Sequence, residues 1–221
     1  MTRRRTTHRS HPRSGAGRVV LLAALAAGLA ACAAGGADAP AYDVVIRNGT
    51  IYDGSGGAPI VGDVAIAGDS IVAVGTLPAG EPARVEIDAR GLAVAPGFIN
   101  MLSWATESLI EDGRAQSDVR QGVTLEVFGE GSSMGPLTDA MKREMAEEQG
   151  DIKYSITWTT LGEYLETLER RGVSVNVASF VGATTVRVHE LGYADRAPDS
   201  AQLARMQQLV RQAMEEGARS A

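Results

Sequence analysis

The feature that most constrains the fold of this 221-residue chain is a change of hydrophobic rhythm at Pro96. Before it, short runs rich in β-branched residues are separated by turn signals such as Asn48-Gly49 and Gly68-Asp69, a pattern typical of a β-meander. After it, apolar runs alternate with segments of helical periodicity. The second part therefore predicts an α/β fold in which helices connect parallel strands by right-handed crossovers.

Two apolar runs and two capped helices define this second part. The runs 123–131 and 173–182 are apolar on both faces, as expected of buried parallel strands. A helix expected over 160–171 begins with a capping box, and another begins at Asp199. These signals amount to about three strand–helix units, whereas a closed barrel has eight and typically needs about 250 residues. An open half barrel leaves unpaired edges, so we expect the chain to be the first part of a longer fold.

The N-terminal segment has the layout of an export signal. Six arginines and no acid precede an apolar run that ends at Cys32. The run is shorter than the roughly 20 residues that a membrane-spanning helix needs. Because Leu29-Ala30-Ala31-Cys32 resembles a bacterial lipobox, we expect residues 1–31 to be a lipoprotein signal peptide and residues 32–41 a tether. The protein is then exported and anchored by lipidated Cys32 to a bacterial membrane, on its periplasmic or cell-surface side; a plain signal peptide cut near Ala31 is the alternative.

The net charge and the cysteine and histidine content limit which partners and metal sites the chain can have. Removing residues 1–31 takes away six arginines and no acid, so the formal net charge changes from −6 to −12 and argues against nucleic acid as a partner. Lipidation of Cys32 leaves no thiol for a disulfide framework or a cysteine-based metal site. His189, which follows the run 173–182, is the only histidine outside the predicted signal peptide.

Several segments together carry a family resemblance. They read YDVVIRNGTIYDGSGGAPIVGDVAIAGDSIVAVG, GLAVAPGFIN and RQGVTLEVFGEGSSMGPL, and FVGATTVRVHELG and LARMQQLVRQAMEEGA continue the match. The chain resembles the N-terminal portion of the N-acyl-D-amino-acid deacylases, or D-aminoacylases, of the metal-dependent amidohydrolase superfamily. The resemblance covers nearly all of the chain after the predicted signal peptide, about the first two fifths of a typical member.

This resemblance implies a fold and a reaction. Residues 42–92 are expected to supply strands of a small β-sandwich, and residues 93–221 the first three or so units of an incomplete (β/α)8 TIM-like barrel. The implied reaction is hydrolysis of a C–N amide bond such as that of an N-acyl-D-amino acid, with zinc or another divalent metal. The family's ligands include a His-x-His pair on strand one, a cysteine after strand two and two later histidines. Those later histidines and the aspartate base are expected beyond Ala221, so the chain alone is expected to be inactive.

The residues at the family's first metal positions differ here. Leu102 and Trp104 stand where the histidine pair is expected, and Gly131 aligns with the cysteine. None of these side chains binds a metal. The neighbouring Glu130 closes a predicted barrel strand at the end where barrel active sites are built, so we hypothesise that it is a metal ligand. The alternative is that Glu130 caps the following helix or forms a structural salt bridge.

Further hypotheses concern the substrate pocket and the class of function. Trp104 and Met101 are candidates for lining a substrate pocket, although packing in the barrel mouth also explains them. Ser133 lies in a G-x-S-x-G pattern that offers a serine hydrolase as an alternative, with His189 as its only base; Pro136 disfavours the helical turn this needs. A non-catalytic, lipid-anchored binding scaffold is the other alternative, supported by the missing histidine pair.

Overall fold

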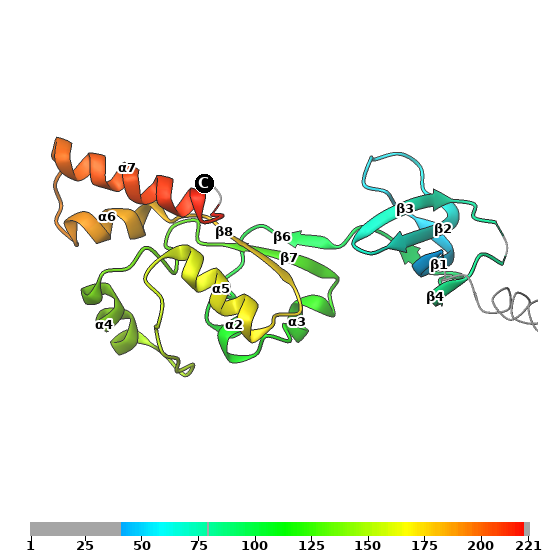
Figure 1. Ribbon diagram of the computed structural model, residues 1–221, viewed down its shortest axis with the longest axis horizontal. Helices are drawn as coiled ribbons and strands as arrows, with labels where there is room; N and C mark the ends of the chain where they lie inside the picture. The colour runs from blue at the N-terminus through cyan, green and yellow to red at the C-terminus, as the bar shows by residue number, and fades with distance from the viewer. Residues whose placement is uncertain (1–40, 79, 219–221) are drawn as a thin grey trace, which may run out of the picture. The chain divides into compact units, whose positions relative to one another are not determined.

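The computed structural model describes residues 41–78 and 80–218, which form two compact units that divide between Ala95 and Pro96 (Figure 1). The predicted signal peptide, Cys32 and nearly all of the predicted tether lie outside the described residues. In the described part of the chain, no helix is both long and apolar enough to cross a membrane.

The first unit is a single sheet with strand order β3-β2-β1-β4, and β5 also pairs with β1. Its strands are β1 (Tyr42–Ile51), β2 (Ile60–Ala67), β3 (Ser70–Gly75), β4 (Ala83–Asp88) and β5 (Ala93–Val94). Strands β1, β2 and β3 pair antiparallel, which confirms the predicted meander for this part. The prediction is wrong for β4, which returns to pair parallel with β1.

One predicted turn is instead a bulge inside a strand. Asn48 has φ 60°, and the pairing of β1 with β2 shifts register between Ile46 and Gly49. The Oδ1 atom of Asp63 accepts a hydrogen bond from the Asn48 backbone N–H at 2.8 Å, so the bulged backbone keeps a partner and the strand continues. At Gly68, with φ 60°, the expected tight turn does connect β2 to β3.

The second unit is built on a parallel sheet with strand order β6-β7-β8, which confirms the predicted parallel strands. Its elements are β6 (Phe98–Asn100), α2 (Ser108–Glu111), α3 (Gln116–Val119), β7 (Val123–Phe128), α4 (Asp139–Glu148), α5 (Leu161–Arg171), β8 (Asn176–Ser179), α6 (Ala183–Leu191) and α7 (Ser200–Glu215). The strands are shorter than predicted, and their burial is uneven. Only the C-terminal half of β7 is fully buried, while Phe98 and Ile99 of β6 are exposed.

An aromatic cluster holds β7 against the helices. The ring of Tyr164 lies edge-on to Phe128, with centroids 6.0 Å apart, and 5.2 Å from the ring of Trp158. The indole N–H of Trp158 donates a 2.7 Å hydrogen bond to the Met134 carbonyl. This bond ties the loop after β7 to the core, which matters because that loop forms much of the site described below.

The two predicted helix starts are confirmed with their caps. Thr160 and Glu163 form a capping box at α5, and Asp199 and Gln202 form one at α7. Gly172, with φ 80°, ends α5 at the place where the sequence predicts a glycine C-cap.

Candidate functional site

A pocket of 580 Å³ lies at the C-terminal ends of β6 and β7. Its lining comes from the segments that follow these strands, from α4, and from the first turns of α6. In folds with parallel strands joined by helices, loops at this end of the sheet build the ligand sites. It is therefore the candidate functional site of the second unit.

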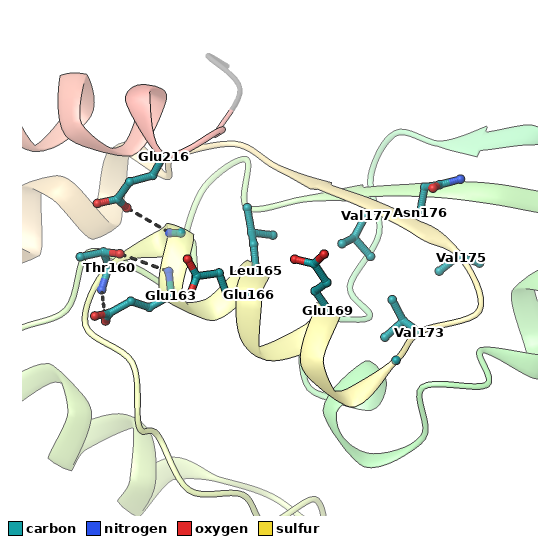
Figure 2. A pocket seen from close by; sticks show the side chains of 12 residues that line it. Thr160, Glu163, Leu165, Glu166, Glu169, Val173, Val175, Asn176, Val177 and Glu216 are labelled. Atoms are coloured by element: carbon teal, nitrogen blue, oxygen red, sulfur yellow. Dashed lines mark hydrogen bonds between the residues drawn. The ribbon is translucent and has the colours of Figure 1, made fainter. Parts of the chain in front are cut away.

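A second hollow, of 680 Å³, lies between α5 and β8 and is less suited to chemistry (Figure 2). Of its four acidic side chains, Glu166 pairs with Arg170 of the same helix, and two make structural hydrogen bonds: Glu163 accepts from the backbone N–H of Thr160, and Glu216 from that of Gly162. Because these carboxylates cap the start of α5, as the dashed lines in Figure 2 show, this groove is explained by the fold itself.

Leu102 and Trp104 stand where the family's histidine pair is expected, and Ser103 between them holds this segment in place. Ser103 is buried, its N–H donates to the Val127 carbonyl at 2.8 Å, and its hydroxyl donates to Glu126 Oε2 at 2.6 Å. On either side, Leu102 and Trp104 face outward, and Trp104 is 86% exposed. The backbone thus places two apolar side chains at the strand end, where both line the pocket.

Sequence reasoning missed the role of Glu126. This glutamate has no exposed surface, and among the described residues its Oε1 atom has no hydrogen-bond partner. Burial raises the pKa of its carboxyl; the bond from Ser103 opposes this, and the charge of Asp118 adds to it. The signal in the sequence is a lone acid inside the apolar run VTLEVF. Glu126 is closed to solvent, and through its bond from Ser103 it holds the segment after β6 in place.

Glu130, the predicted metal ligand, is exposed and lines the pocket directly after β7. It does not cap α4, because the Oγ1 atom of Thr138 accepts the hydrogen bond from the Met141 N–H at 3.2 Å. It also forms no ion pair with any residue that the structure describes.

The described residues do not form a metal site by themselves. Nowhere within residues 41–78 and 80–218 do three histidine, cysteine, aspartate or glutamate side chains gather closely enough to hold an ion. A site that uses Glu130 therefore needs further ligands from outside this part of the chain.

Ser133 is a structural hydrogen-bonding centre. Its buried hydroxyl donates to the Gly135 carbonyl at 2.6 Å and accepts from the Gly182 N–H at 2.9 Å, while its own N–H donates to Thr185 Oγ1 at 2.8 Å. The nucleophile hypothesis needs a hydrogen bond to His189, and the structure shows none between these two described residues. His189 lies in α6 with its Nδ1 atom 3.4 Å from Glu190 Oε1.

The two residues predicted to line a substrate pocket are separated by the structure. Trp104 lines the pocket at the strand ends, whereas Met101, which is exposed, is not one of its lining residues. The remaining apolar lining, which sequence reasoning missed, comes from methionines of α4 and of the loop after β7, together with Phe128, Leu137 and Val188. Their contribution depends on tertiary packing, which no local pattern reveals.

Comparison with known proteins gives this geometry a family context. An N-acyl-D-aspartate deacylase of Alcaligenes xylosoxydans xylosoxydans is 36% identical over 183 residues, covering 82% of this chain and 36% of the relative. A D-aminoacylase of the same organism is 31% identical over 185 residues, covering 82% and 37%, respectively. The chain is a homologue of the N-acyl-D-amino-acid deacylases. It spans little more than a third of the length of these curated relatives, and no protein-family model matches it.

Solved structures agree with this homology. The structure of a D-aminoacylase with a binuclear metal centre superimposes on this chain with a TM-score of 0.68. The two are 31% identical, and the match covers 80% of this chain and 37% of the D-aminoacylase. The N-acyl-D-glutamate deacylase of Bordetella bronchiseptica, solved with zinc and a phosphonate mimic of the tetrahedral intermediate, gives 0.67 at 28% identity, covering 79% and 36%. The α/β fold of this chain is thus that of the amidohydrolases, and the solved relatives contain metal.

Proposed function

We propose that the full-length protein hydrolyses the amide bond of an N-acyl amino acid. The observation that carries this proposal is the superposition on D-aminoacylase over 80% of the chain, which includes the parallel strands whose C-terminal ends open into the pocket. The relatives act on substrates named as N-acyl-D-aspartate, N-acyl-D-glutamate and D-amino-acid derivatives, so an N-acyl-D-amino acid is the substrate class to test first.

The proposal also includes the complete architecture to which the two sheets belong. Strands β6, β7 and β8, with the helices between them, are the first units of a TIM-like barrel, and the sheet of β1 to β5 is one layer of a small β-sandwich. Support comes from the parallel register of β6 to β8 and from the apolar face of the first sheet, part of which is exposed.

The decisive assay uses purified full-length protein and a panel of N-acetyl-D-amino acids, with release of the free amine as the readout. We expect turnover that is lost on chelation and restored by zinc. Absence of turnover on every member of the panel, with the metal loaded, would contradict the proposed activity. A serine-directed phosphonate probe tests the alternative, and because the hydroxyl of buried Ser133 is already hydrogen-bonded, we expect that residue to stay unlabelled.

Glu130 is proposed as one ligand of the metal. Its support is its place after β7, its exposure to the pocket and the absence of an ion pair to it among the described residues. The test is the metal content of Glu130→Gln measured by mass spectrometry, with Glu147→Gln as a control of equal charge change on the exposed surface of α4. Loss of zinc only in Glu130→Gln supports the assignment, and equal zinc content in the two variants would remove it.

A binding scaffold without catalysis is the second candidate, and the observation in its favour is that Leu102 and Trp104 occupy the strand end in place of ligands. Stoichiometric zinc in the full-length protein would decide against it, since a pure scaffold has no need of the metal.

Export and lipid anchoring through Cys32 are also proposed, on the sequence pattern alone. Labelling of cells with a fatty acid, compared between the natural protein and Cys32→Ser, tests this directly. We expect label only in the natural protein, and label in both would contradict the assignment.

A further inference from the structure

Three methionines form one part of the apolar lining of the pocket at the strand ends, called here the methionine wall. Met134 comes from the loop after β7, and Met141 and Met145 come from α4. Leu102 and Trp104, which also line the pocket, come from the segment after β6. Methionine side chains are unbranched and polarizable, so such a wall adapts to apolar groups of different shapes. The wall therefore fits an extended apolar arm of a ligand better than a compact polar one.

All the charged residues of the pocket have the same sign. They are Glu130, Glu144 and Glu148, and no lysine, arginine or histidine is among the described residues that line it. The hydroxyl of Tyr193 donates a 2.7 Å hydrogen bond to Glu144. That bond, with the charges of Glu144 and Glu148, raises the pKa of the exposed Tyr193.

Two cations on the neighbouring helices are engaged elsewhere. On α4, the Nζ atom of Lys142 donates to Thr159 Oγ1 at 2.7 Å. On α6, Arg187 donates to the carbonyls of Ala194 and Arg196, both at 2.9 Å. Neither of these side chains lines the pocket, and neither does the exposed Arg143 of α4, so the charged groups that a ligand would touch directly are carboxylates.

We propose, resting on the hydrolase function proposed above, that this pocket receives the side chain of the N-acyl amino acid and selects apolar or basic side chains over acidic ones. An apolar or basic side chain lays its methylene groups on the methionine wall, and a terminal cation meets the carboxylates of α4. An acidic side chain brings a like charge against the carboxylates of Glu144 and Glu148, which disfavours it. The chain thus differs in specificity from relatives that act on acidic substrates.

Three probes test this preference: N-acetyl-D-methionine, Nα-acetyl-D-lysine and N-acetyl-D-glutamate. All three share the scissile amide, the acetyl group and the α-carboxylate, so ratios of kcat/KM on the full-length protein report the side chain alone. We expect the glutamate derivative to be at least about tenfold poorer than the other two. A preference for glutamate would overturn the inference while leaving the proposed function intact; hydrolysis of none of the three would overturn both.

A charge reversal shows whether the pocket itself is responsible. Glu148 lines the pocket, whereas the adjacent Glu147 is exposed on the same helix and does not. In Glu148→Lys we expect the lysine-to-glutamate ratio of kcat/KM to fall by about tenfold. In Glu147→Lys, which changes the net charge equally, we expect that ratio to stay within about twofold. Equal shifts in the two variants would mean a diffuse surface effect and would overturn the assignment.

Discussion

The two sheets of this molecule have strands of similar apolar character but differ in how well they are covered. In the first unit, Val85 and Ile87 of β4 pair with Val44 and Ile46 of β1 on one face, yet both β4 side chains remain about half exposed. In the second unit, Phe128 of β7 is buried against the helix α5. Apolar patterning therefore marks which side chains can be buried, whereas elements from elsewhere in the fold decide which of them are.

The largest difference in stability is expected when one large aliphatic side chain in each unit is shortened to alanine. Leu168 of α5 has no exposed surface and lies in the core of the second unit, whereas Ile87 is 45% exposed. Leu168→Ala leaves a cavity and should cost about 3 kcal/mol of unfolding free energy, against less than about 1 kcal/mol for Ile87→Ala. Urea denaturation measures both. Equal losses would show that the apolar face of β4 is covered in the full-length protein.

A second contrast lies inside the segment after β7, where two glycines flank Glu130. Gly129 has φ 88°, and a Cβ there would come within 2.5 Å of the Phe180 carbonyl oxygen; Gly131 has open space around it. Gly129→Ala should therefore cost about 2 kcal/mol through backbone strain and this clash, whereas Gly131→Ala should change stability by less than about 0.5 kcal/mol. Thermal unfolding of both variants checks this, and tolerance of Gly129→Ala would mean that the loop relaxes easily.

These contrasts show where sequence reasoning succeeds. The caps at Thr160 and Asp199 and the turn at Gly68 depend on side chains within a few residues of each other, so the sequence predicts them directly. The parallel pairing of β6, β7 and β8 follows from the helical segments between these strands, since parallel strands need such crossovers.

The errors have long-range causes. The bulge at Asn48 is stabilised by Asp63, fifteen positions along the chain and on another strand. The importance of Glu126 depends on Ser103, which precedes it by 23 positions. At the site, sequence reasoning placed Glu130 and Trp104 in the pocket but missed the methionine wall, because that wall forms only when α4 packs beside the strand ends. Local pattern cannot contain such information.

The buried carboxyl of the second unit should make stability depend on pH. Burial raises the folded pKa of Glu126 above its ordinary value of 4.5, so its contribution to stability is greatest below that value and is lost as pH rises through the raised pKa. Glu126→Gln removes the charge but keeps an acceptor for Ser103, so we expect it to be about 1 kcal/mol more stable at pH 7 and unchanged near pH 4. Glu147→Gln, on the exposed surface, is the control. A destabilised Glu126→Gln at pH 7 would show that the charged form is needed.

The first unit should respond to pH in the opposite direction, with the smallest effect of the four. The backbone N–H groups of Asn48 and Leu77 and the guanidinium of Arg47 hold the pKa of Asp63 below its ordinary value of 3.8, and the Asn48 N–H has the greatest effect. The stabilisation is therefore present above that value and is lost as pH falls through the lowered pKa. Asp63→Asn should cost about 0.5 kcal/mol at neutral pH, because the network is partly solvated, and this cost should disappear once the pH is below the lowered pKa. Urea midpoints measured from pH 2 to 7 separate this window from that of Glu126. The stability difference between each variant and the natural protein should change over a different pH range for each variant, because one pKa is raised and the other lowered. If the two differences changed over the same range, the direction of one of these two pKa shifts would be wrong.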